Sequence, residues 1–167
     1  MDPIDLIKHA QALLHSRKGA PKQVDLRRAV SAAYYAVFHA VLRAAADELV
    51  GSSQAARKSA AYAIIYRGYE HAQMKSACID LSKPHMPPRL AAVFGTRQLP
   101  QLYRSTARVF VTLQEARHLA DYAPTHRFYK SEAATAISQA NFGVANILYG
   151  SGPIRKAFLL ALLLRIR

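Results

Sequence analysis

Apolar residues recur at intervals of three and four along most of the chain, and no stretch shows the sustained two-residue alternation of a half-buried strand. Breaks that contain glycine or proline divide this helical pattern into segments. The pattern predicts helices over about residues 3–16, 24–50, 54–80, 100–120 and 131–149, a short helix near 89–94 and a last apolar segment over 153–167. We therefore expect an all-α protein, an antiparallel bundle of five to six helices over residues 1–150, with an apolar and basic helix over residues 151–167.

Residues 24–50 carry the clearest pattern. One face holds large apolar side chains at helical spacing, and a second face is lined by alanines that suit close contact with another helix. A neighbouring row at four-residue steps consists of Ser31, Tyr35, His39 and Arg43. We expect Tyr35 and His39 on this row to line a cleft or a dimer seam, although a lone histidine on a helix can also be purely structural.

The composition narrows the class of protein. With 167 residues the chain has the length of one domain, and a hydrophobic content of 51% is enough for a substantial core. The single cysteine, Cys78, excludes a disulfide framework and a thiolate-rich zinc site. Because the histidines are scattered, the carboxylates few and no glycine-rich phosphate loop is present, we expect neither a metal nor a cofactor.

The net charge of +13 points to a polyanionic partner, either nucleic acid or an anionic membrane surface. Much of this charge lies between residues 49 and 114, where the sequence has nine basic residues and only two acidic ones, Glu70 and Asp80. The candidate nucleic-acid-binding residues in this region are Arg57, Lys58, Arg67, Lys75, Arg104 and Arg108. A basic region of this kind can follow the phosphates of RNA.

The predicted helix over residues 54–80 places part of this charge in a stripe. Arg67, His71 and Lys75 are spaced at four-residue steps and would share one face of that helix. His71 is the member that could transfer protons near neutral pH. The alternative is an ordinary solvated helix face.

Three segments together resemble a known family. The first runs from Leu26 to Ala40 and contains Ser-x-x-Tyr-Tyr-Ala-x-Phe-His, the second covers residues 66–75, and the third contains Arg-x-x-Ala-Asp-Tyr at residues 117–122. This combination resembles the bacterial group of the HEPN family over about residues 1–148. The resemblance implies an all-α, dimeric fold, and in many members a metal-independent ribonuclease with an Arg-x4-6-His motif. It also implies a toxin role beside a nucleotidyltransferase antitoxin.

On the matching positions Arg117 is the motif arginine, His118 follows it, and Tyr122 stands where nucleolytic members have histidine. Because tyrosine has a pKa near 10, it transfers protons poorly near neutral pH, so His118, His71 or His126 would have to supply the imidazole. We therefore take Arg117, His118, Tyr122 and His71 as the candidate catalytic residues, with Asp121 in the possible cleft lining. The alternative is that Arg117, Asp121 and Tyr122 form a buried cluster that locks the end of the helix.

The segment over residues 154–167 is too apolar for a solvated helix and too short to span a bilayer. We expect it to pack on its own bundle or on a dimer partner; the alternative is a docking helix or a basic membrane anchor. The acidic first residues are followed by no apolar run of signal-peptide length, so the sequence predicts a cytoplasmic protein.

Three functional hypotheses follow. The first is a homodimeric RNA-interacting protein of the HEPN type, with a possible role as a metal-independent endoribonuclease in toxicity or defence. The second is a non-catalytic partner of a nucleotidyltransferase, in which Tyr122 marks lost nuclease chemistry. The third is a basic helical DNA-binding protein, although the chain has no helix-turn-helix spacing.

Overall fold

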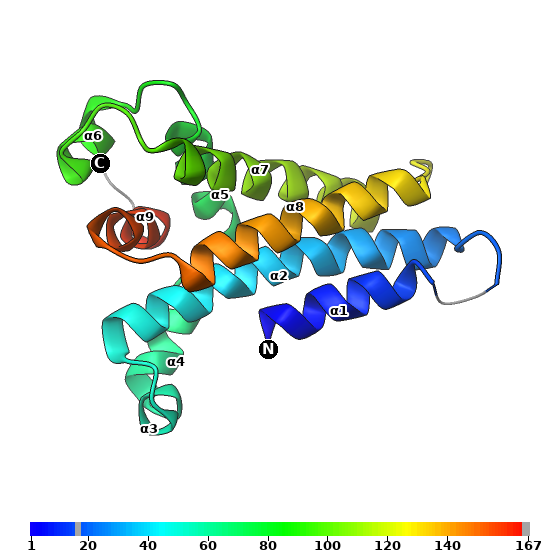
Figure 1. Ribbon diagram of the computed structural model, residues 1–167, viewed down its shortest axis with the longest axis horizontal. Coiled ribbons are helices and arrows are strands. Elements are labelled where there is room, and N and C mark those ends of the chain that lie inside the picture. The colour runs from blue at the N-terminus through cyan, green and yellow to red at the C-terminus, as the bar shows by residue number, and fades with distance from the viewer. Residues whose placement is uncertain (16–17, 165–167) are drawn as a thin grey trace. The chain divides into compact units, whose positions relative to one another are not determined.

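The computed structural model describes residues 1–15 and 18–164, and the described residues form helices and no strand (Figure 1). The helices are α1 (Pro3–Leu13), α2 (Gln23–Val50), α3 (Gln54–Arg57), α4 (Ala60–Arg67), α5 (His71–Leu81), α6 (Pro88–Phe94), α7 (Gln101–Tyr122), α8 (Lys130–Tyr149) and α9 (Pro153–Leu163). The prediction of an all-α helical bundle is confirmed. Ser16, the predicted end of the first helix, and residues 165–167 of the predicted last segment lie outside the described residues.

The single helix predicted over residues 54–80 is wrong. Helix α3 ends at Arg57, and Ser59 starts α4, because its hydroxyl accepts a hydrogen bond from the backbone N–H of Tyr62 at 3.2 Å. Gly68 caps the end of α4, and α5 begins only at His71. Arg67 and His71 therefore lie on different helices, so the predicted stripe does not lie on one helix; His71 and Lys75 alone remain one turn apart on α5.

The chain divides into two compact units. The first comprises residues 1–39 and 109–145, and the second comprises residues 40–108 together with the chain from residue 146 onward. Helices α2, α7 and α8 each contribute one part to each unit.

The first unit is a bundle of α1 with adjoining parts of α2, α7 and α8 (Figure 1). Its centre is the fully buried Tyr34 of α2, whose ring meets the edge of Phe110 on α7 at 5.6 Å. Gly143 lets α8 approach closely, because a Cβ there would lie 3.3 Å from a methyl group of Val37 and 3.4 Å from one of Val109. The close helix contact expected of the alanine-rich helix thus depends on a glycine from another helix.

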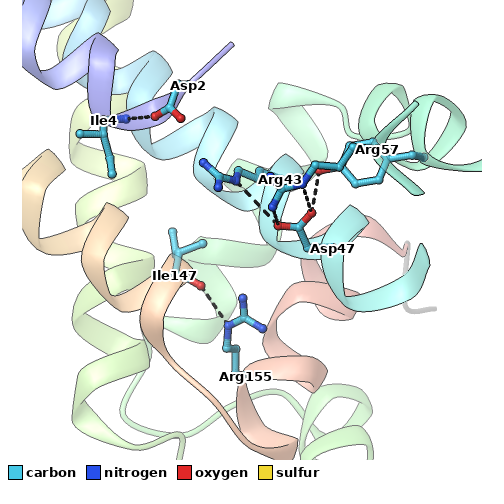
Figure 2. A network of polar contacts seen from close by, with 8 residues as sticks. Asp2, Ile4, Arg43, Asp47, Arg57, Ile147 and Arg155 are labelled. Carbon is cyan, nitrogen blue, oxygen red and sulfur yellow. Dashed lines mark hydrogen bonds and ion pairs between the residues drawn. The ribbon is translucent and has the colours of Figure 1, made fainter. Parts of the chain in front are cut away.

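In the second unit α9 packs against α5 and α6, and its Phe158, Leu159 and Leu162 are buried. The ring of Phe158 lies 5.5 Å from that of Tyr103. Arg155 holds the start of α9, since its Nε donates to the carbonyl of Ile147 at 2.9 Å (Figure 2). Packing on its own bundle, one of the alternatives for this segment, is what α9 does within the described residues.

The end of α2 carries a network of charges centred on Asp47 (Figure 2). Arg57 donates to both carboxylate oxygens of Asp47, at 3.0 and 2.7 Å, and the Tyr62 hydroxyl donates to it at 2.9 Å. Burial and the hydrogen bond to Asp47 raise the pKa of Tyr62 to about 12. This network fixes α3 and α4 to the end of α2.

Helix α2 is long and apolar enough to cross a membrane, judged by length and composition alone. Within its most apolar stretch, 78% of the residues are buried inside the protein. The core helix of a water-soluble bundle passes the same test, so the observation is weak evidence for a membrane span.

Candidate functional site

The polar cluster of the first unit is centred on Arg117, on the last turns of α7. Its Nη2 donates a hydrogen bond to the hydroxyl of Tyr35 on α2 at 2.9 Å. Its Nε lies 2.6 Å from Oδ2 of Asp121, one turn further along α7. The other carboxylate oxygen of Asp121 accepts a hydrogen bond from Ser31 on α2 at 2.6 Å. We call these four residues the Arg117 cluster: Ser31, Tyr35, Arg117 and Asp121.

These contacts hold the guanidinium on two sides and leave its third side open. Among the described residues, none accepts a hydrogen bond from Nη1 of Arg117. The side chain is partly exposed, at 21%. Burial alone would lower the pKa of Arg117, but Tyr35, Asp121 and Tyr122 together raise it above its ordinary value. The group is therefore a fixed cation with one free edge, which is the arrangement that recognises a phosphate.

One further aromatic side chain borders this cation, and a second borders that side chain in turn. Tyr122 lies with its ring 5.3 Å from Cζ of Arg117, and its side chain is 62% exposed. The imidazole of His118 lies 5.1 Å from the Tyr122 ring and is exposed. The structure thus brings together three of the candidate catalytic residues, namely Arg117, His118 and Tyr122.

The alternative of a buried cluster of Arg117, Asp121 and Tyr122 is corrected in one respect, because Tyr122 is exposed. Arg117 and Asp121 do contact each other, and they tie α7 to α2 through Tyr35 and Ser31. The end of α7 is held by Arg27 of α2. Its guanidinium donates to the carbonyls of Leu119, Ala120, Ala123, Pro124 and His126, at 3.5, 2.8, 2.6, 3.2 and 2.6 Å. A cation that satisfies the free carbonyls of a helix end also complements the helix dipole.

Sequence reasoning did not identify Arg27 as a functional or structural residue. Its acceptors are backbone carbonyls that lie 92 to 99 residues further along the chain. Carbonyl groups are present at every position and carry no residue-specific pattern. Only the tertiary contact between α2 and the end of α7 reveals the clamp.

A groove lies beside the Arg117 cluster, between α1, α2 and the end of α7. Its volume is about 690 Å³. Tyr35, His39 and Asp121, the residues expected to line a cleft, all line it. The remaining walls include apolar side chains from α1 and α2, together with His9, Arg27 and Arg28.

Two other histidines are candidates for proton transfer. His71 begins α5 and belongs to the second unit. His126 lies in the loop after α7, where its ring contacts Phe128 at 4.6 Å and its carbonyl accepts from Arg27.

The candidate nucleic-acid-binding residues all lie in the second unit, where several of them make contacts with described residues. Arg57 pairs with Asp47, Arg104 donates to Gln101, and Arg108 donates to the carbonyl of Ser82 at 3.2 Å. Lys58 and Arg67 are exposed, whereas Lys75 is half-buried. These six residues therefore do not form one uniform, solvent-facing row.

Within residues 1–15 and 18–164, no group of three or more histidine, cysteine or acidic side chains could hold a metal ion. Cys78 is fully buried, and burial raises the pKa of its thiol, which disfavours the reactive thiolate. No protein-family model, curated protein or solved structure matches the chain.

Proposed function

We propose that the protein is an RNA-interacting protein of the HEPN type, and that it holds an RNA phosphate on the free edge of Arg117. The proposal rests on one observation above all. Arg117 is fixed by Tyr35 and Asp121, while its Nη1 is bonded to no described residue. A guanidinium that is already oriented loses little conformational entropy when a phosphate binds.

The surroundings of Arg117 also support cleavage of the strand. In metal-independent cleavage the RNA 2′-oxygen attacks the adjacent phosphorus, the bond to the 5′-oxygen breaks, and a 2′,3′-cyclic phosphate forms. The 2′-hydroxyl gives up a proton and the leaving 5′-oxygen takes one. Arg117 would stabilise the charge that develops on the phosphate, and His118 would move protons near neutral pH. In this role the protein would be a homodimeric endoribonuclease in toxicity or defence.

Cleavage by the purified protein tests this function. A labelled RNA is incubated with the protein in excess chelator, and we expect cleavage that ends in cyclic phosphate. Arg117→Ala should reduce the rate by about 100-fold or more, which is the usual cost of removing one group that stabilises transition-state charge. Arg97→Ala is the matched control, because Arg97 is exposed and lies in the second unit.

The outcomes separate binding from catalysis. If Arg117→Ala cleaves RNA as fast as the wild type, the catalytic role of Arg117 is wrong. If the wild type binds RNA with an affinity that depends on Arg117 but does not cut it, the protein is an RNA-binding protein without nuclease activity. If neither binding nor cleavage depends on Arg117, the proposed function is overturned.

A second function is favoured by Tyr122 itself. Its phenol is 62% exposed and borders a cation, at the position where nucleolytic members of the resembled family have histidine. We propose as the alternative that the chain is a non-catalytic partner of a nucleotidyltransferase. Co-purification with such an enzyme, without ribonuclease activity, would favour this alternative. An adenylyl group found on Tyr122 by mass spectrometry would instead indicate regulation of a toxin.

A further inference from the structure

We propose that the groove between α1, α2 and the end of α7 receives an unpaired base of the RNA strand whose phosphate is held by Arg117. The protein would therefore select single-stranded over duplex RNA. This inference rests on the proposed function and goes further, because it assigns a second subsite and a class of substrate to it.

The groove offers the surfaces that a base requires. The rings of Tyr35 and His39 stand one turn apart on α2, with centroids 6.3 Å apart and planes inclined by 31°. Apolar side chains supply the remaining walls, among them Leu6 and Val24. An aromatic side chain beside an apolar wall is the platform on which proteins stack single-stranded bases.

The groove is continuous with the Arg117 cluster. Tyr35 and Asp121 line the groove and also contact Arg117. The hydrogen bond from Arg117 fixes the Tyr35 ring, so the phosphate site and the stacking surface share one side chain. A phosphate and the base next to it are joined by one sugar, and they must therefore bind at adjoining places.

The charge of the groove favours an anionic occupant. Arg27 donates to five carbonyls, and Asp121, the only carboxylate among the described residues that line the groove, is compensated by Arg117. Arg28 also lines the groove and is exposed, and no described residue forms an ion pair with it. The uncompensated charge is thus positive, as a strand of RNA requires and an uncharged apolar peptide does not.

A duplex has no unpaired base that could enter the groove. Its bases are paired and stacked inside the helix, and a base could enter the groove only after it is flipped out at the cost of unstacking and unpairing. Single-stranded RNA bears no pairing cost. The preference for single strands should therefore come from the groove, whereas the phosphate contact at Arg117 serves both forms.

The test uses a short RNA with 2-aminopurine at one position, as a single strand and as a duplex with its complement. We expect the single strand to bind about tenfold or more tightly than the duplex, and its fluorescence to change on binding as the base stacks. Ala32→Leu adds bulk to the wall of the groove and leaves the side chains of the Arg117 cluster unsubstituted. This variant should lose both the preference and the fluorescence change, and keep the weaker, salt-dependent binding.

A second pair of variants keeps the test decisive if Ala32→Leu fails to fold. Val24 lines the groove and is 49% exposed, whereas Val93 on α6 is 48% exposed and lies in the second unit. Val24→Glu should abolish the preference for single strands, and Val93→Glu should retain it. Circular dichroism checks that both variants remain folded.

Each failure has its own signature. If Arg117→Ala weakens RNA binding but Ala32→Leu and Val24→Glu keep the wild-type preference, the base subsite is wrong and the proposed function stands. If the groove variants change the oligomeric state in light scattering and leave the preference intact, the groove is an interface between copies. If Arg117→Ala has no effect on binding, the proposed function itself fails.

Discussion

The hydroxyl of Tyr35 accepts a hydrogen bond from Nη2 of Arg117 at 2.9 Å, which joins α2 to α7 at the edge of the groove. These two residues lie 82 positions apart, in the two segments with the most distinctive sequence motifs. The contact gives both side chains one orientation. It explains how a partly exposed cation near the end of a helix is held in one place.

Removal of this hydroxyl should weaken both stability and binding. Tyr35→Phe removes the acceptor and keeps the ring, so we expect a loss of about 0.5–1.5 kcal/mol in the free energy of unfolding, the usual net worth of one hydrogen bond. RNA binding should weaken several-fold, since Arg117 becomes less ordered. Urea unfolding and RNA titration measure the two effects. Tyr129→Phe is the control, because Tyr129 is 72% exposed, and an equal loss in both variants would contradict the prediction.

Arg27 should contribute more to stability than its neighbour Arg28. Arg27→Met leaves several carbonyls at the end of α7 without a donor, so we expect a loss of about 2–3 kcal/mol in the free energy of unfolding. Arg28 is exposed and bonds to no described residue, so Arg28→Met should change stability by less than about 0.5 kcal/mol. Thermal and urea unfolding measure the difference. Equal stability of the two variants would show that the carbonyl clamp is energetically unimportant.

Gly143 should tolerate no large side chain. A Cβ at this position would already lie 3.3 Å from Val37, and Leu would force the helices apart. We expect Gly143→Leu to destabilise the fold by about 1–3 kcal/mol, as overpacking of a core does. Ala145→Leu, at an exposed position of the same helix, is the control and should be nearly neutral. A stabilised Gly143→Leu protein would contradict the close packing of α8.

The Asp47 network should make stability fall at alkaline pH. The pKa of Tyr62 rises from 10.0 to about 12 in the folded state. Between these values the unfolded chain loses the phenol proton while the folded protein retains it, so stability present below pH 10 is lost as pH rises toward 12. Urea midpoints measured at pH 8, 10 and 11 should fall less steeply for Tyr62→Phe. Tyr149→Phe, at an exposed position, should follow the wild type.

The sequence predicted helix boundaries best where a regular spacing of apolar residues stopped at a glycine or proline. The helix predicted over residues 24–50 agrees closely with α2, which ends before Gly51 with its positive φ of 110°. The pattern was misleading over residues 54–80, where helix-forming residues surround Ser59 and Gly68. Ser59 caps the start of α4 and Gly68 caps its end, although the apolar spacing continues through both positions. One predicted helix is therefore three helices in the structure.

The sequence predicted which residues belong to the candidate site, but it did not predict the contacts that these residues make between the two helices. The spacing within α7 placed Arg117 and Asp121 one turn apart, and the row on α2 placed Tyr35 beside Ser31 at a four-residue step. Which residues of one helix meet those of the other depends on how the helices pack. That packing is set by many side chains and by Gly143, and no local pattern records it.

The sequence by itself determined that the chain is helical, basic and rich enough in apolar residues to form a core, because helical spacing and composition are local properties that need no partner. Only the tertiary structure decided that Arg117 is held by Tyr35 and Asp121 with one edge free, that Arg27 clamps the end of α7, and that a groove adjoins both. The contacts between α2 and the end of α7 join residues about 80 to 100 positions apart, and the order of residues along a helix does not encode which distant side chain or carbonyl will lie beside it.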